Sequence, residues 1–201
     1  MLSCKTIILL SLMSLFSGVL VPVSAFAENL LPNHDFSRGL SEWQTRFQEE
    51  NEKKYWENHK HVTVVANPVG SGRALRLTLP RAVAASQGVK VQSQLMEVKP
   101  GKSYMFGAEI ISEGPTPKII LEGYTEDSQR QTKGADQIPG YRRIYRAVIH
   151  PDSVDAQEWS THSREISPPS RYQPSHVLIK LYAYWPKGTI YFNNVELRKT
   201  D

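Results

Sequence analysis

The chain has 201 residues, of which 40% are hydrophobic, 22% charged and 9% aromatic. This ordinary globular composition excludes a largely disordered chain, a collagen-like fibre and a coiled coil. The formal net charge is +4, and the basic residues are interspersed with acidic ones. Without a strong basic stripe, nucleic acid is not an expected partner, although mild attraction to anionic glycans is compatible with this charge.

The first 27 residues have the layout of a secretory signal peptide. Lys5 supplies a positive charge, an apolar stretch covers 6–20, and Ala25 and Ala27 are the small residues that a signal peptidase reads. Several serines, a glycine and a proline make this stretch poor for a membrane span of about 20 residues. We therefore expect cleavage after Ala27, a single domain over 28–201, no membrane span, and a secreted or periplasmic location.

The only cysteine, Cys4, lies inside this leader. The mature chain is therefore expected to have no disulfide and no thiolate metal site. A chain of this size buries about 70% of its unfolded surface, which is enough for one core without disulfide support.

Short β-type runs separated by turn residues dominate the chain after residue 60. In the run 176–185, every second residue from Val177 to Ala183 is small or apolar, and the residues between them are mostly polar or aromatic. Strands with one apolar face are best satisfied by two packed antiparallel sheets, so we expect an all-β fold, a β-sandwich of the jelly-roll type. The expected strands are 61–66, 74–80, 88–98, 103–112, 118–124, 141–150, 160–166, 176–185 and 189–198.

Two connecting segments carry further expectations. Pro100 and Gly101 have the residue types of a type II turn, which predicts a hairpin between 88–98 and 103–112. The charged segment 46–58 is compatible with a short helix or with a loop.

Both ends of the mature chain carry recognisable motifs. The segment 29–43, NLLPNHDFSRGLSEW, resembles the opening of the galactose-binding-domain-like carbohydrate-binding modules of families 4, 9 and 22, and 188–197, GTIYFNNVEL, is similar to their closing strand. The resemblance extends from Asn29 to Arg198. It implies a β-sandwich, which is used for glycan binding, for protein contact and as an enzyme accessory module. It also implies that Trp43 and Trp159 are core residues.

The same resemblance raises the question of a structural calcium ion. Related modules often hold calcium through a carboxylate after the opening phenylalanine and an aspartate in the last strand, and Ser37 and Asn193 stand at these places. Calcium favours several charged oxygens, so two neutral replacements weaken such a site. We expect no cofactor or metal, and Asp35 or backbone carbonyls are the donors that could still support a structural calcium.

A sugar ring presents apolar C–H faces and a rim of hydroxyls, so its site needs an exposed aromatic plane beside polar groups. Tyr182, Tyr184 and Lys180 share one face of their strand and offer this combination. The alternative is that the tyrosine rings pack over the other side of the sheet and expose only their hydroxyls to solvent. The complete set of expected carbohydrate-binding residues is Tyr182, Tyr184, Lys180, Tyr124, Glu122, Gln92 and Trp56.

Other candidates carry less weight. Arg142, Arg143 and Arg146 straddle both faces of one strand, so at most two can act together on an anionic sugar, and a solvated edge is the simpler interpretation. Trp185 precedes a turn and is either an aromatic residue on the rim or a plug for the end of the sandwich.

No catalytic residues are assigned, because the chain has neither a GxSxG elbow nor an HExxH helix. The sequence therefore favours a secreted non-catalytic protein that binds a polysaccharide. The alternative from another class is an envelope structural or adaptor protein that uses the sandwich for protein contact. A polysaccharide lyase or hydrolase is the third hypothesis.

Overall fold

The computed structural model describes residues 28–45, 55–129 and 138–201, and for 55–57 it describes the backbone alone. The expected signal peptide, residues 1–27, lies outside the described residues. Within the described part, no helix is long and apolar enough to cross a membrane.

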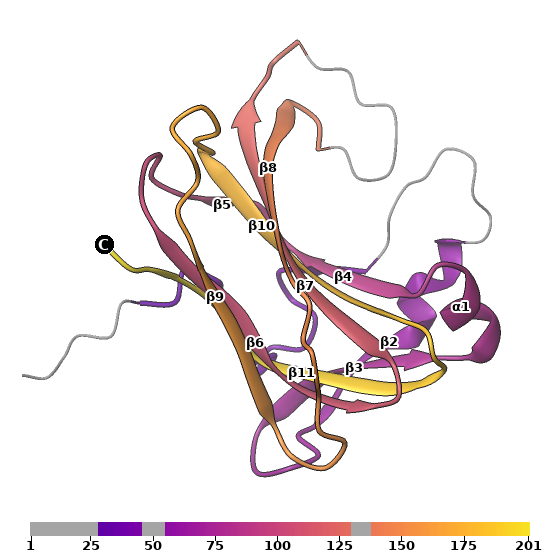
Figure 1. Cartoon of the computed structure of the whole chain (residues 1–201). Coiled ribbons are helices and arrows are strands. Elements are labelled where there is room, and N and C mark those ends of the chain that lie inside the picture. Colours follow the sequence, from indigo (N-terminus) through magenta and orange to yellow (C-terminus); the bar gives the residue numbers. More distant parts are fainter. Residues whose placement is uncertain (1–27, 46–54, 130–137) are drawn as a thin grey trace, which may run out of the picture.

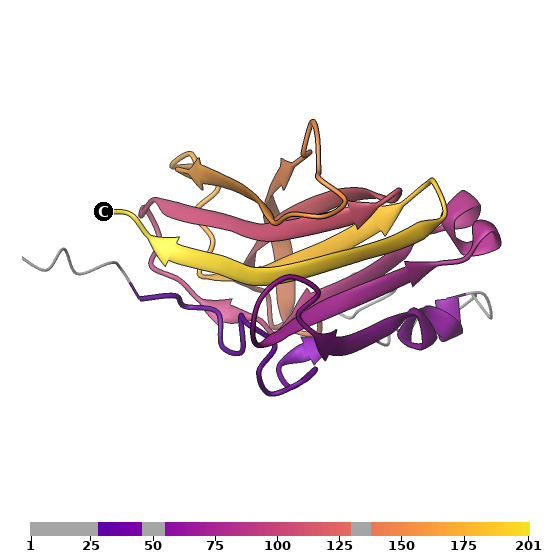
Figure 2. The same cartoon turned by 90° about the horizontal axis from the view of Figure 1, so that it is seen from below.

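The described chain forms two antiparallel sheets, which confirms the expected β-sandwich (Figures 1 and 2). The six-stranded sheet has the order β1-β4-β10-β7-β8, with β5 paired to β10, and the five-stranded sheet has the order β2-β3-β11-β6-β9. The strands are β1 (Trp43–Gln44), β2 (Val62–Ala66), β3 (Arg73–Leu79), β4 (Val89–Ser93), β5 (Met96–Glu97), β6 (Tyr104–Glu113), β7 (Thr116–Glu126), β8 (Tyr141–Ile149), β9 (Ser160–Ile166), β10 (His176–Tyr184) and β11 (Gly188–Lys199).

The alternating patterns define the core. Leu75 and Leu77 of the five-stranded sheet and Ile119 and Leu121 of the six-stranded sheet are fully buried and belong to one hydrophobic cluster between the layers. Each fully buried aliphatic side chain stabilises the fold by about 1.5–3 kcal/mol. The intervening residues of the six-stranded sheet lie on the opposite face, which we call the outer face.

The opening segment and the last strand, which carried the resemblance, lie together. Asn29 donates its amide to the carbonyl of Val195 (2.9 Å) and accepts from the backbone N–H of Leu197 (3.0 Å). The Trp43 indole donates to the Asn33 carbonyl (3.1 Å). Trp43 is buried, as expected, and its ring centroid lies 5.1 Å from that of Phe36. The 29–43 motif therefore closes one side of the core against β11.

One local prediction is wrong, and one short helix was not predicted. Gly101 has the expected positive φ of 76°, but no hairpin forms, because β5 pairs with β10 in one sheet while β6 belongs to the other. The turn instead carries the chain between layers. The segment 81–86 is a short helix, α1 (Arg81–Ser86), which lies at one end of the sandwich (Figure 1). Six residues without a side-chain cap give too weak a pattern to be predicted.

The segment 46–58 is only partly described. Residues 46–54 lie outside the described part, and the 3₁₀-helix η1 (Tyr55–His61) follows. Asn58 of η1 is buried and donates to the carbonyls of Thr45 and Lys90, both at 2.8 Å. Asn58 therefore ties η1 to the chain after β1 and to β4, at the edge of the six-stranded sheet.

Gly88, between α1 and β4, sets how closely the chain approaches β10. Its φ is +69°, and a Cβ there would collide with the carbonyl oxygen of Ala183 and lie 2.9 Å from the Tyr182 ring. Only glycine satisfies both the left-handed backbone and the close contact.

We predict that Gly88→Ala lowers the free energy of unfolding by more than about 3 kcal/mol, because conformational strain and a backbone collision add. Gly39 is the matched control: its φ is also +69°, but nothing lies within 4 Å of a Cβ. Gly39→Ala should cost only about 1 kcal/mol. Equal losses in urea unfolding would contradict the proposed close approach.

Candidate functional site

The outer face of β10 carries Leu178, Lys180, Tyr182 and Tyr184. Strand register places Lys180 beside Gln92 of β4 and Ile120 of β7, and Tyr182 beside Lys90 and Lys118. Residues directly opposite one another in a sheet share a face. The outer face is therefore a mixed surface of cations, amides and aromatic rings.

Glu122 is at the centre of this face. Its carboxylate is 3% exposed and lies 2.9 Å from the Lys180 ammonium, which is itself only 6% exposed. The Arg143 guanidinium donates to the other carboxylate oxygen at 2.6 Å, and the Tyr124 hydroxyl donates at 2.7 Å. Arg146 lies 3.9 Å away. A buried charge with this many partners is held in one geometry.

These contacts decide the ionisation of Glu122. Burial alone would raise the pKa of its carboxyl, but the Lys180 charge and hydrogen bond, the Tyr124 hydrogen bond and the Arg143 charge outweigh it. The pKa lies below its ordinary value of 4.5. Glu122 is therefore a permanent anion at neutral pH.

A β-bulge brings both arginines to Glu122. Gly123 pairs with Tyr145 and Tyr124 pairs with Arg143, so Ile144 has no partner on β7. In a regular strand, positions 143 and 146 would point to opposite faces, since side chains alternate. The extra residue shifts the register and places Arg143 and Arg146 on the same face. The sequence interpretation of a solvated edge is thus incomplete, because these two arginines form part of the Glu122 cluster.

The aromatic part of the outer face is a tyrosine pair. The rings of Tyr182 and Tyr184 are stacked, with centroids 5.7 Å apart and planes 13° apart, and both residues are half-buried. The Tyr182 hydroxyl donates to the carbonyl of Gln87 (2.8 Å), and the Lys118 ammonium lies 4.5 Å from the Tyr184 ring centroid. Stacking and a cation–π contact fix these rings in place.

A pocket of about 320 Å³ opens on the outer face beside the tyrosine pair. This volume is at the lower end of the range of about 300–1,000 Å³ typical of ligand pockets. We call it the basic pocket. It is lined by Lys90, Lys118, Ile120, Glu122, Arg143, Arg146, Lys180 and Tyr182.

The structure gathers part of the expected site. Tyr182, Lys180 and Glu122 line the basic pocket, and Tyr184 stacks beside it. Gln92 is mostly buried and donates to the Gln44 side chain at 2.8 Å, at the β1 edge of the same face. Lys90, Lys118 and Ile120 also line the pocket and were not among the expected site residues. Arg143 and Arg146 line it as well, although the sequence favoured a solvated edge for them.

Four aromatic residues of the sequence analysis have outcomes of their own. Tyr124 is on the same face as Glu122 but is only 1% exposed, and its hydroxyl donates to Glu122. It therefore positions the carboxylate and presents no ring to a ligand. Trp159 is half-buried and donates to the Asn67 side chain, so its assignment to the core is wrong. The Trp56 side chain lies outside the described residues. Trp185 is 51% exposed, which excludes a plug.

The residues at the expected calcium position meet at a different pocket. Asp35, Ser37, Glu109 and Asn193 line it together. The buried Asn193 Oδ1 has no hydrogen-bond partner, but Asp35 accepts from Ser37 and Glu109 accepts from Asn194. No group of three or more acidic, histidine or cysteine side chains that could hold a metal occurs among the described residues. Calcium takes six to eight oxygen ligands, and the carboxylates among the described residues lining this pocket are those of Asp35 and Glu109.

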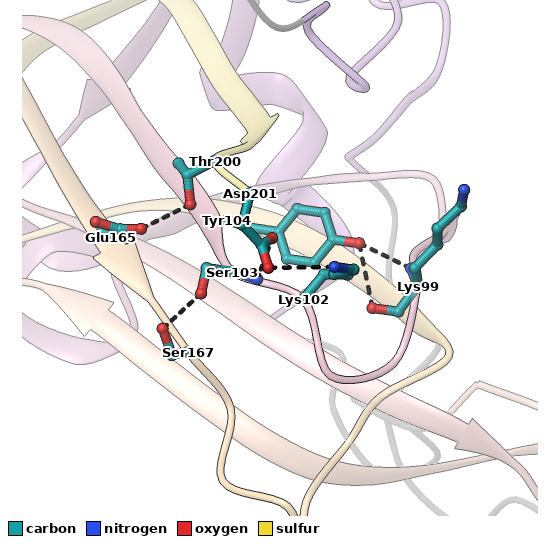
Figure 3. Close-up of polar contacts among 8 residues, drawn as sticks. All are labelled: Lys99, Lys102, Ser103, Tyr104, Glu165, Ser167, Thr200 and Asp201. Carbon is teal, nitrogen blue, oxygen red and sulfur yellow. Dashed lines mark hydrogen bonds and ion pairs between the residues drawn. The ribbon is translucent and has the colours of Figure 1, made fainter.

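A further polar cluster lies at the C-terminal end of β11 (Figure 3). The Asp201 carboxylate accepts from the backbone N–H of Ser103 (3.0 Å), and Thr200 donates to Glu165 (2.6 Å). Tyr104 both donates to and accepts from the backbone of Lys99, and burial raises the pKa of its hydroxyl. These groups satisfy one another, so the cluster fastens the chain end to β6 and β9.

Comparisons with solved structures agree with this architecture. The chain is similar to a family 16 carbohydrate-binding module at 14% identity and a TM-score of 0.53, over 84% of this chain and 99% of that one. It is also similar to a family 61 module solved in complex with β-1,4-galactotriose, at 18% identity and a TM-score of 0.50, over 87% of this chain and all of that one.

A third similar structure is the enzymatically active domain of tailspike protein 4 from bacteriophage CBA120, at 14% identity and a TM-score of 0.51. The match covers 86% of this chain but 21% of that one. Neither the protein-family models nor the curated proteins give a match. The chain therefore has the β-sandwich fold of carbohydrate-binding modules.

We predict that Glu122→Gln lowers the free energy of unfolding at pH 7 by roughly 2–4 kcal/mol, because Lys180 then stays buried beside a neutral group. The folded-state pKa of Glu122 is depressed, so its contribution is complete above the ordinary value of 4.5 and is lost as the pH falls through the folded value. The difference between wild type and variant should therefore shrink below about pH 4.5.

The matched control is Glu126→Gln, at the exposed end of the same strand. It should be near neutral in the same pH series of denaturant unfolding. A Glu122→Gln protein as stable as wild type at pH 7 would show that the buried ion pair does not support the fold.

Proposed function

We propose that this protein is a secreted or periplasmic, non-catalytic module that binds a polysaccharide on the outer face of its six-stranded sheet. The observation that carries the proposal is the stacked Tyr182–Tyr184 pair beside the basic pocket. An aromatic surface next to fixed polar groups suits a ligand with apolar ring faces and a polar rim.

The rigidity of this surface supports binding. The Tyr182 ring is held by its neighbour, by its hydrogen bond to Gln87 and by the close approach of Gly88. A surface fixed before binding loses little side-chain entropy when a ligand arrives. The two similar carbohydrate-binding modules, one of them bound to a galactotriose, support the same class of ligand.

The chemistry of the pocket argues for binding without catalysis. Glycoside hydrolysis uses a pair of carboxyl groups, one of which must be protonated to act as the acid. Among the described residues lining the basic pocket, Glu122 is the only carboxylate, and Lys180 and Arg143 hold it ionised. A lyase needs a base, for which a tyrosine hydroxyl is one choice, but the Tyr182 hydroxyl donates to the Gln87 carbonyl.

We predict that Tyr184→Ala raises the dissociation constant for a bound polysaccharide about five- to tenfold, because it removes one ring of the aromatic surface. Affinity electrophoresis against a panel of polysaccharides measures this as a loss of retardation. Tyr184 is preferred to Tyr182 because its substitution leaves the Gln87 hydrogen bond intact.

Tyr191→Ala is the matched control, since Tyr191 is equally half-buried but lies on β11 of the five-stranded sheet. It should keep wild-type retardation. Equal effects of the two substitutions would contradict the proposed face, and no retardation of the wild type across the panel would refute the proposed function.

A further inference from the structure

Most of the charged side chains that line the basic pocket are cationic. Among the described lining residues, five are lysines or arginines, Lys90, Lys118, Lys180, Arg143 and Arg146, and one is a carboxylate, Glu122. The whole chain has a formal net charge of only +4, so this is a local concentration of basic side chains. Confined cations raise the local concentration of anionic ligands.

Two pockets beside the five-stranded sheet have a different lining. The described residues of one include Glu109 and Glu196 with Arg198, and those of the other include Asp35 and Glu109 with Arg73. In both, carboxylates outnumber lysines and arginines among the described lining residues. The basic pocket, next to the tyrosine pair, has the reverse balance.

The basic pocket also offers more hydrogen-bond donors than acceptors. Lysine and arginine side chains are donors without acceptors. The one carboxylate already receives hydrogen bonds or ion pairs from Lys180, Tyr124 and Arg143. A neutral sugar hydroxyl needs an acceptor as well as a donor, whereas carboxylate and sulfate groups are acceptors only. The pocket thus matches an anionic group better than a hydroxyl.

Arg143 and Arg146 each have guanidinium N–H donors that do not contact Glu122. Their side chains are 46% and 54% exposed, compared with 6% for Lys180. The hydrogen bond from Arg143 to Glu122 uses Nη1, one of the three nitrogens of a guanidinium group with five N–H donors. A hydrogen bond to Glu122 holds the Arg143 guanidinium, and the Arg146 Nε lies 3.9 Å from the same carboxylate, while about half of each side chain is exposed. The guanidinium fork suits a carboxylate or a sulfate group, either of which can accept two parallel hydrogen bonds.

We infer that the polysaccharide bound by this protein is acidic, with a uronate carboxylate or a sulfate ester seated in the basic pocket against Arg143 and Arg146 and a sugar ring on the tyrosine pair. This inference rests on the proposed function and specifies its ligand class. Lys180 positions Glu122, which in turn orients the arginines.

The test compares polymers that differ only in charge. Polygalacturonate and its methyl ester share one backbone, and dextran sulfate and dextran share another; the two pairs distinguish carboxylate from sulfate. By calorimetric titration we expect at least tenfold tighter binding of the charged member of one pair, with affinity that falls as ionic strength rises.

The variants are Arg143→Gln and Arg146→Gln, with Arg76→Gln as the matched control, because Arg76 lies on β3 of the other sheet and contacts Thr63. Arg143→Gln should weaken binding of the acidic polymer about tenfold and Arg146→Gln about threefold, while Arg76→Gln has no effect. Because Arg143 also contacts Glu122, Arg146→Gln is the variant that keeps the test valid if Arg143→Gln unfolds.

The other outcomes are distinct. Equal binding of charged and neutral polymers, unaffected by the arginine variants but weakened by Tyr184→Ala, would overturn the acidic ligand and leave the proposed function intact. Equal weakening by Arg76→Gln would reveal nonspecific ion exchange and also overturn the inference. No binding of any polymer would overturn both.

Discussion

The outer face of the six-stranded sheet depends on one buried carboxylate. Glu122 is almost fully enclosed and is satisfied by Lys180, Tyr124 and Arg143. A lone buried charge would be strongly destabilising, so each partner must keep its place for the sheet to pack. The same cluster includes two half-exposed guanidinium groups and lines the basic pocket beside the tyrosine pair. Stability and the proposed ligand recognition therefore share one set of contacts.

Two backbone features shape this face. The bulge at Ile144 turns Arg143 and Arg146 to the same side of β8, and Gly88 lets the chain approach β10 closely enough to hold Tyr182. The mixed character of the face, with Ile120 between cations, then follows from strand register.

The sequence predicted the layers well and the site in part. Alternation in β10 indicated which of its side chains enter the core. It also placed Lys180, Tyr182 and Tyr184 together on the other face, because side-chain direction in a strand has a period of two. The same rule failed for β8, since a bulge breaks the period and leaves no clear signal in the sequence.

The burial of Tyr124 was not predicted for another reason: alternation shows which face of the sheet a residue is on, but not whether other side chains cover it. The hairpin at Gly101 failed because turn chemistry does not specify which sheet the next strand joins.

The central claim is that the outer face of the six-stranded sheet binds an acidic glycan. NMR titration of the ¹⁵N-labelled protein with a short galacturonate oligosaccharide tests it most directly, because backbone amides and arginine Nε–H groups report contact residue by residue. The account predicts the largest shifts in β7, β8 and β10 around Glu122, including the Nε–H signals of Arg143 and Arg146. Shifts confined to the strands of the five-stranded sheet would contradict it.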